Sequence, residues 1–150
     1  MTPGGDRPGG AAGPACVACL GAWPDPADRI AALDESVAYL HADQFFPGWT
    51  VLVLRGHATE LFELDAPARA RLVEEVSATA RVVARLFGAR KVNYALLGNQ
   101  LPHVHWHVIP RLPTDPAPRE APFAVPHEPL ALPVAERARR IAAIRRALGR

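Results

Sequence analysis

Hydrophobic and polar positions along the chain predict three strands and leave one segment open. Residues 49–54 are rich in β-branched and aromatic side chains and follow a Pro-Gly turn signal, which predicts a buried strand. Residues 91–97 and 103–110 are also strand-like, and the loop of about five residues between them predicts an antiparallel hairpin. Residues 28–41 mix apolar and polar positions and suit either a short helix or the start of a hairpin.

Apolar residues at helical spacing predict two helices. In residues 65–87, Asp65 can cap the first turn, Pro67 lies within that turn, and Gly88 can end the helix in a left-handed conformation. Residues 135–148 combine an apolar stripe with several arginines, which predicts a basic helix. We expect the stripe to pack on the domain or on a partner subunit; the alternative is a basic face that contacts nucleic acid or an acidic membrane.

The organisation along the chain predicts one domain between two less regular ends. A chain of 150 residues has room for a single domain, which we place at residues 15–112. Residues 1–14 are rich in Gly and Pro and lack the apolar core of a signal peptide, so we expect a disordered tail. Residues 113–150 are expected to add a Pro-rich surface segment and the basic helix. No apolar run approaches the length of a bilayer span, and we expect a cytoplasmic protein with no membrane partner.

Net charge adds little about partners. The chain carries a net charge of +2 with its histidines neutral, and its pI is about 8.8. Many of its arginines fall within the C-terminal helix, so the rest of the chain is less basic than the total suggests. The chain therefore lacks the concentration of Lys and Arg that a duplex-binding domain needs, which disfavours nucleic acid as a partner.

The stretch from His103 to His107, His-Val-His-Trp-His, is the most informative for chemistry. Side chains alternate faces along a strand, so the three histidines are expected on one face, with neighbours about 7 Å apart, while Val104 and Trp106 point the other way. A neutral imidazole can act as a nucleophile, a proton shuttle or a hydrogen-bond donor near neutral pH. Three such rings could instead bind a catalytic zinc ion with one open position, but the local motif favours nucleotide chemistry.

This stretch resembles the His-x-His-x-His-apolar-apolar signature of the histidine triad family, and the similarity extends over about residues 16–111. The resemblance implies an α+β fold in which an antiparallel sheet of about five strands packs against one long central helix and a C-terminal helix. It also implies a homodimer and a hydrolase of the diadenosine polyphosphate hydrolase-like branch, acting on dinucleoside polyphosphates or nucleoside phosphoramidates. The related transferase branch has Gln at the third triad position, so His107 favours hydrolysis over transfer.

The resemblance also assigns catalytic roles. His105 would attack the α-phosphorus in line and form a covalent nucleotidyl-histidine that water then hydrolyses. His107 would donate a hydrogen bond to the transferring phosphate and help to protonate the leaving group, and His103 would brace the strand. Gln100 and Asn99 look like donors on the phosphate side. No cofactor is implied for catalysis.

For the nucleoside, the resemblance points to a further set of residues. Asn93 would lie near the nucleotide, Asp43 would bind the ribose hydroxyls, and Phe45 or Phe46 would contact the base. Each has an ordinary structural alternative, because Asp43 suits a turn and the phenylalanines suit a core. Asn99, assigned to the phosphate, could likewise serve only to favour a tight loop.

One position departs from the family pattern. Many members have a histidine in a Gly-His-Thr context a few residues before the Val-Leu stretch of the strand, and here Trp49 stands at that place, in Gly48-Trp49-Thr50. We expect its indole to pack in the site and its N–H to orient the neighbouring groups. The substitution also leaves open a second function, that of a nucleotide-binding or sensing protein with weak or no catalysis.

Cys16 and Cys19 are separated by two residues and are the only cysteines in the chain. Two thiolates supply half of a tetrahedral zinc site, and His57 and His103 are the candidates for the other two ligands. Some bacterial triad proteins resemble this arrangement. The spacing therefore predicts a candidate structural zinc site, with a pair of unliganded thiols as the alternative.

Overall fold

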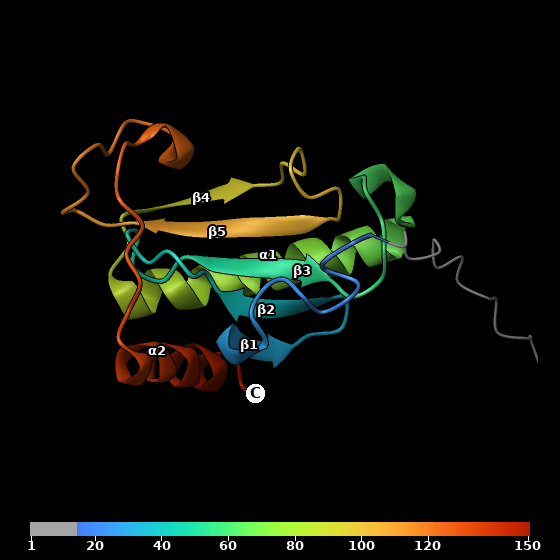
Figure 1. Cartoon of the computed structure of the whole chain (residues 1–150), viewed down its shortest axis with the longest axis horizontal. Coiled ribbons are helices and arrows are strands. Elements are labelled where there is room, and N and C mark those ends of the chain that lie inside the picture. Colours follow the sequence, from blue (N-terminus) through green and yellow to red (C-terminus); the bar gives the residue numbers. More distant parts are fainter. Residues whose placement is uncertain (1–14) are drawn as a thin grey trace, which may run out of the picture.

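A computed structural model describes residues 15–150 and places them in an antiparallel sheet covered by two helices (Figure 1). The tail predicted for residues 1–14 lies outside the described residues. The sheet has the order β1-β2-β3-β5-β4, and all neighbouring strands are antiparallel. Its strands are β1 (Arg29–Ala32), β2 (Ser36–Leu40), β3 (Thr50–Leu54), β4 (Lys91–Ala95) and β5 (His105–Arg111). The α+β prediction is confirmed.

Two predictions about the strands are refined by the structure. The segment left open at residues 28–41 forms the β1-β2 hairpin, in which Leu33 N–H donates to the Ser36 carbonyl across the turn (2.7 Å). The strand predicted from residue 103 begins at His105 instead, because His103 N–H donates to the Leu101 carbonyl (2.8 Å) in a turn just before it. His103 is thus held by a turn and not by the strand ladder.

The two predicted helices are present. α1 (Ala66–Phe87) begins at Asp65, whose carboxylate accepts from Ala68 N–H (2.7 Å), and ends at Gly88 with a φ of 68°. α2 (Val134–Ala147) lies near the C-terminus. Short 3-10 turns complete the described elements: η1 (Pro26–Asp28), η2 (Leu61–Glu63) and η3 (Pro122–Ala124). Among residues 15–150, no helix combines the length and the apolarity that crossing a membrane requires.

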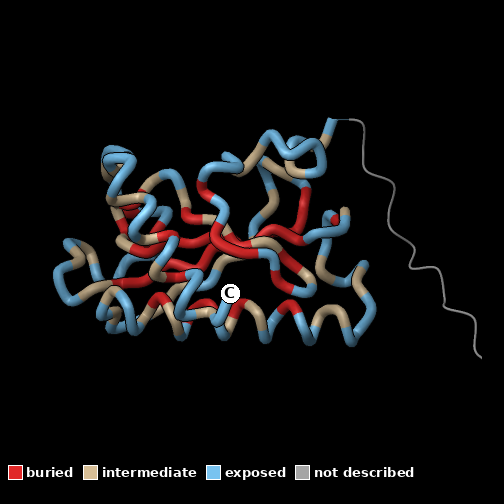
Figure 2. Tube along the Cα trace, turned by 90° about the horizontal axis from the view of Figure 1, so that it is seen from below, coloured by how far each residue is buried: buried red, intermediate tan, exposed pale blue. Residues whose placement is uncertain are grey.

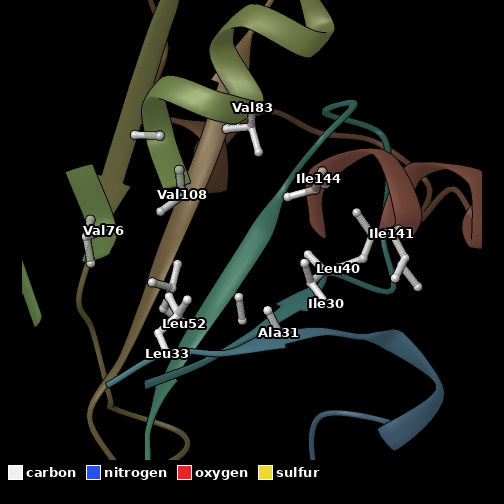
Figure 3. Close-up of a cluster of buried hydrophobic side chains, with 12 residues drawn as sticks. Ile30, Ala31, Leu33, Leu40, Leu52, Val76, Val83, Val108, Ile141 and Ile144 are labelled. Carbon is white, nitrogen blue, oxygen red and sulfur yellow. The ribbon is translucent and has the colours of Figure 1, made fainter. Parts of the chain in front are cut away.

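Both helices pack on the same side of the sheet and enclose the main core. Val83 of α1, Val108 of β5 and Ile144 of α2 are fully buried in one cluster (Figure 3). Buried positions follow the strands and the inward side of the helices, while the outer surfaces are exposed (Figure 2). The apolar stripe of α2 therefore packs on the domain, which is one of the two arrangements predicted for it. The opposite face of the sheet is not covered by these two helices, and the candidate functional site described below lies there.

The Pro-rich segment after β5 has no strand and returns past the sheet to α2 (Figure 1). Arg111, at the end of β5, is 4% exposed and anchors this segment. Its guanidinium donates to the Asp115 carboxylate and to the carbonyls of Ala117 and Glu120 (both 2.7 Å). One buried cation thus fixes the path of a segment that its prolines prevent from joining the sheet.

Candidate functional site

A cavity of about 720 Å³ lies on the sheet face opposite the helices, within the size range of small-molecule sites. It is bounded by residues 17–23, the β2-β3 turn, the β4-β5 loop, β5 and η3, and of the residues that the structure describes no Lys, Arg, Asp or Glu lines it. The lining residues are Val17, Ala22, Trp23, His41, Trp49, Leu97, Gly98, Asn99, Gln100, Leu101, His105, His107 and Phe123. Two of the three triad histidines are therefore in the cavity, together with both loop residues predicted on the phosphate side.

His105 is held in one tautomer. Its Nδ1 lies 2.6 Å from the His103 carbonyl oxygen, and a carbonyl can only accept, so Nδ1 carries the hydrogen. In the neutral ring Nε2 then holds a lone pair, and it makes no hydrogen bond to any of residues 15–150. The edge of the Trp23 ring contacts the His105 ring, with the centroids 5.1 Å apart. His105 therefore offers an unengaged nucleophilic nitrogen inside the cavity.

His107 is held in the opposite tautomer. Trp49 Nε1–H donates to His107 Nδ1 (3.1 Å), and an indole nitrogen can only donate, so the hydrogen of the neutral His107 ring is on Nε2. Burial, together with His105 and His41, lowers the pKa of His107 to about 3. His107 is therefore a neutral donor at physiological pH. The expectation that the Trp49 N–H orients the site is confirmed.

His103 does not line the cavity and faces the cysteines instead. Its Nε2–H donates to the Leu54 carbonyl (2.9 Å), which leaves the Nδ1 lone pair directed at Cys16, Cys19 and His57. Burial is the main cause that lowers the pKa of His103 and keeps the ring neutral, as a ligand must be. The three triad rings thus serve two neighbouring sites.

The four residues predicted to bind zinc form one cluster. One donor atom from each of Cys16, Cys19, His57 and His103 lies within 4.8 Å of the others. Four of the donor-atom pairs, Cys16–His103, Cys19–His57, Cys19–His103 and His57–His103, are 3.2 to 3.6 Å apart. Tetrahedral zinc, with bonds of about 2.3 Å to sulfur and about 2.0 Å to nitrogen, places its ligand atoms about 3.3–3.8 Å apart. The cluster therefore has the donor set and the spacing of a tetrahedral metal site.

Asn93 is placed outside the cavity. Its side-chain oxygen accepts from Arg111 Nη1 (2.8 Å), so this amide helps to hold the cation that anchors the Pro-rich segment. Asn93, which was predicted to contact the nucleotide, is hydrogen-bonded to Arg111 of the same chain instead.

Asp43 and Phe45 also lie outside the cavity. The Asp43 carboxylate accepts from the N–H groups of Phe45 and Leu130 (both 2.9 Å) and pairs with His127 Nε2 (2.7 Å). Burial raises the pKa of Asp43, but these hydrogen bonds outweigh it and hold the pKa below its ordinary value. The Phe45 ring stacks on His127, with the centroids 4.0 Å apart. The carboxylate predicted to bind ribose is thus fully engaged within the chain.

Three of the ring-bearing cavity residues were not anticipated from the sequence: His41, Trp23 and Phe123. His41 follows β2 and stacks on the Trp49 ring at 3.7 Å. Trp23 and Phe123 come from irregular segments, where no periodic pattern marks a residue for the site. His41 could have been identified only from its position directly after β2, a strand that ends near the triad.

Comparisons with known proteins agree with this arrangement. The HIT domain family matches residues 24–114. A histidine triad protein from Bradyrhizobium japonicum is 33% identical, with 81% of this chain and 91% of that chain covered and a TM-score of 0.74. The comparison with curated proteins gives no match.

Two more distant structures share the fold. A Zn-bound histidine triad family protein from Mycobacterium smegmatis is 22% identical, covers 90% of this chain and 94% of its own, and has a TM-score of 0.65. A diadenosine triphosphate hydrolase from Plasmodium falciparum is 15% identical, covers 83% and 78%, and has a TM-score of 0.64.

Proposed function

The chain belongs to the histidine triad (HIT) family, and from this premise we propose that it is a hydrolase that acts at the α-phosphate of a nucleotide. The observation that carries the proposal is the pair of opposite tautomers at His105 and His107. One ring presents a lone pair and the next presents an N–H, in a cavity large enough for a nucleotide. A nucleophile beside a preorganised donor is what phosphoryl transfer requires.

In the proposed reaction, His105 Nε2 forms a bond to the α-phosphorus while the P–N or P–O bond to the leaving group breaks, and the leaving group takes up a proton from water. The ring gains positive charge as it does so, and Nδ1–H, held by the His103 carbonyl, stabilises that charge. His107 Nε2–H donates to a phosphate oxygen. Water then cleaves the nucleotidyl-histidine and restores His105.

The lining of the cavity guides the choice of substrate. A dinucleoside polyphosphate brings several charges on its leaving group, and no cationic side chain among residues 15–150 lines the cavity to receive them. The leaving group of a nucleoside phosphoramidate is an amine, which needs no such partner. We therefore favour phosphoramidates, with dinucleoside polyphosphates as the second class.

The test is turnover of adenosine 5′-phosphoramidate and diadenosine triphosphate, with acid-quench detection of the covalent adduct. We expect turnover and an adduct in the wild type, and a loss of at least about 10³-fold in His105→Ala, which lacks the nucleophile. His127→Ala is the matched control, because this histidine lies outside the cavity, and it should form the adduct. Absence of both turnover and adduct in the wild type would overturn the enzyme proposal.

A second candidate function is nucleotide binding or sensing with weak or no catalysis. The observation that favours it is the low pKa of His107. At a pKa of about 3 this ring is seldom an imidazolium and has little capacity to deliver a proton. Calorimetry separates the two functions. Nucleotide binding without an adduct would support the sensor.

We also propose that the cluster of Cys16, Cys19, His57 and His103 binds a structural zinc ion. The support is the match between its spacing and a zinc tetrahedron, and thiolate ligands agree with a reducing compartment such as the cytoplasm. Purified protein should contain about one zinc per chain. Cys19→Ser should lose the metal and lower Tm, while His105→Ala should retain it. A metal-free wild type, purified without chelators and refractory to added zinc, would exclude the site.

A further inference from the structure

Residues 15–24 lie on the surface of the domain and lead from the two cysteines to the cavity. None of them is buried, and none belongs to a hydrophobic core cluster. Backbone hydrogen bonds hold the segment together, with the Val17 carbonyl accepting from the N–H groups of Ala22 (2.8 Å) and Trp23 (3.2 Å). The segment is therefore a compact turn that lies outside the core.

Apart from the chain itself, this segment has one polar attachment to the domain. It is the group of Cys16, Cys19, His57 and His103, here called the metal cluster. No other hydrogen bond or ion pair links residues 15–24 to the rest of the described chain. Free thiols are weak hydrogen-bonding groups, whereas a coordinated metal ion fixes all four donors. How firmly the segment is held thus depends on whether the metal cluster is loaded.

At its other end the segment places Trp23 against the nucleophile of the proposed reaction. The rings of Trp23 and His105 form a T-shaped pair, with the centroids 5.1 Å apart and the planes at 73°, which is a favourable geometry for two aromatic rings. The other ring next to His105 is that of His107, on the same strand, at 5.2 Å. Trp23 therefore supports the His105 ring from outside the sheet.

The metal cluster also reaches His105 through His103, but this second connection is fixed without a metal. The His103 ring donates to the Leu54 carbonyl (2.9 Å), and its N–H donates to the Leu101 carbonyl (2.8 Å). The His103 carbonyl that accepts from His105 Nδ1 is thus held by the domain itself. Of the two connections, the one through Trp23 is the one that depends on the cluster.

We propose that Trp23 is a positioning residue for His105 and that metal binding by the cluster keeps it in place. The inference rests on the proposed function, in which His105 is the nucleophile, and on the proposed zinc site. Trp23 acts by limiting the rotation of the His105 ring, so that Nε2 stays aligned for attack. Loss of the contact is expected to lower kcat about fivefold, the effect of one aromatic pair.

The first test follows the indole N–H signals in the NMR spectrum of the full chain, with and without zinc. The chain has three tryptophans, and Trp23→Phe and Trp106→Phe assign two of the signals by their absence. Removal of zinc by a chelator should shift the Trp23 signal toward that of a solvated indole, and added zinc should restore it. The Trp106 signal should stay in place, because this ring packs on the helix side of the sheet, away from the cluster.

The second test separates positioning from substrate binding. With adenosine 5′-phosphoramidate, Trp23→Ala should lower kcat about fivefold and change KM less. Trp23→Phe keeps a ring against His105 and should retain most of kcat. The matched control is Leu20→Ala, since Leu20 is exposed on the same segment and does not line the cavity, and its kcat should stay within about twofold of the wild type.

The outcomes separate this inference from the proposals on which it rests. A Trp23 signal that does not respond to zinc would overturn the inference alone, in a comparison that needs no variant to be active. A raised KM with unchanged kcat in Trp23→Ala would overturn it too, because Trp23 would then be a wall for the substrate. Movement of the Trp106 signal with that of Trp23 would mean that the metal supports the whole fold, which also contradicts it. Absence of the adduct in the wild type would remove the proposed function, and absence of zinc uptake would remove the metal site, and the inference fails with either.

Discussion

At the scale of single residues, the site depends on two imidazoles with the same chemistry and opposite surroundings. His105 faces a carbonyl and His107 faces an indole N–H, so one exposes a lone pair and the other a hydrogen. Neither arrangement requires a charged side chain in the cavity. The division between nucleophile and donor therefore comes from the neighbours of each ring and not from different residue types.

Trp49 is the residue that fixes His107, and its N–H can be removed on its own. In Trp49→Phe, His107 Nδ1 loses its donor and the ring is no longer confined to the tautomer with hydrogen on Nε2. We expect kcat to fall about tenfold, the effect of one hydrogen bond made to the reacting group, with KM changed less. Steady-state kinetics on the best substrate of the panel measure both.

The matched control is Trp106→Phe. Trp106 lies on the same strand but faces the helices, and its buried Nε1 has no hydrogen-bond partner in the structure. Removal of that N–H should leave kcat within about twofold of the wild type, since no partner is left unpaired. Equal losses of kcat in the two variants would mean that Trp49 acts through packing and not through its N–H.

At the scale of elements, one ion pair fastens the Pro-rich segment to the turn between β2 and β3. Both ring nitrogens of His127 face acceptors, Nδ1 the Val125 carbonyl (2.8 Å) and Nε2 the Asp43 carboxylate (2.7 Å). Only the imidazolium can donate to both. The Asp43 carboxylate is the main cause that raises the pKa of His127, with a smaller contribution from Glu128.

This pair gives the stability a defined pH dependence. Because folding raises the pKa of His127, its contribution is complete below the ordinary value of 6.5 and is lost as the pH rises through the raised value. Folding lowers the pKa of Asp43, so its contribution is present above 3.8 and is lost as the pH falls through the lowered value. We expect His127→Gln to lower Tm by about 4 °C at pH 5, and by less at pH 9.

Thermal unfolding across that pH range measures the effect. If the pair is the cause, Asp43→Asn with His127→Gln should cost little more than either substitution alone. A Tm difference independent of pH would show that His127 stabilises the segment through its stacking on Phe45.

The packing of α2 is tested at its centre. Ile144 is 0% exposed and Val134, on the same helix, is 77% exposed. Ile144→Ala should lower the free energy of unfolding by about 3 kcal/mol, because it removes buried methyl groups and leaves a cavity. Val134→Ala should change it by less than about 0.5 kcal/mol. Denaturant titrations compare the two, and similar values would mean that α2 contributes little to the core.

The elements that could be predicted from sequence are those with local signals. α1 was placed nearly to the residue because Asp65 and Gly88 mark its ends within the chain itself. The segment at residues 28–41 could not be decided, because strand preference depends on neighbours that only the folded sheet supplies. The first residue of β5 was predicted two positions too early. The reason is the turn at His103, which depends on a contact with Leu101.

The site divides in the same way. Spacing along the chain marked the cysteine pair and put His105 and His107 on one strand face. The choice of His57 and His103 as further zinc ligands drew on the family resemblance. Apart from Phe45, the partners of Asp43 and Asn93 could not be foreseen, because they come from residues 18 to 87 positions away. Local spacing identified the chemistry, and long-range contacts decided which neighbours were free to serve it.

At the scale of the whole molecule, the two edges of the sheet differ: α2 contacts β1, where Arg145 donates to the Arg29 and Ile30 carbonyls, whereas the outer edge of β4 has no such cover among residues 15–150. β4 is the last strand, and its outer edge presents unpaired backbone groups of the kind that proteins cover or pair (Figure 1). Apolar side chains are exposed on β4 and on α1, with Tyr94 at 49% and Val73 and Leu86 at 42% and 45%. α1 contacts β4, so both elements belong to one side of the molecule.

We propose that two copies associate through this edge, in agreement with the homodimer that the family resemblance implies. Sedimentation equilibrium of the wild type should give about twice the 16.2 kDa of the chain at micromolar concentration. Tyr94→Lys should shift the mass toward the monomer, because a charge on an edge strand opposes pairing. Val134→Lys, at an exposed apolar residue on α2, should remain dimeric. A wild type that sediments as a monomer at 100 μM would show that there is no such dimer. Equal dissociation of the two variants would show that the interface does not involve β4.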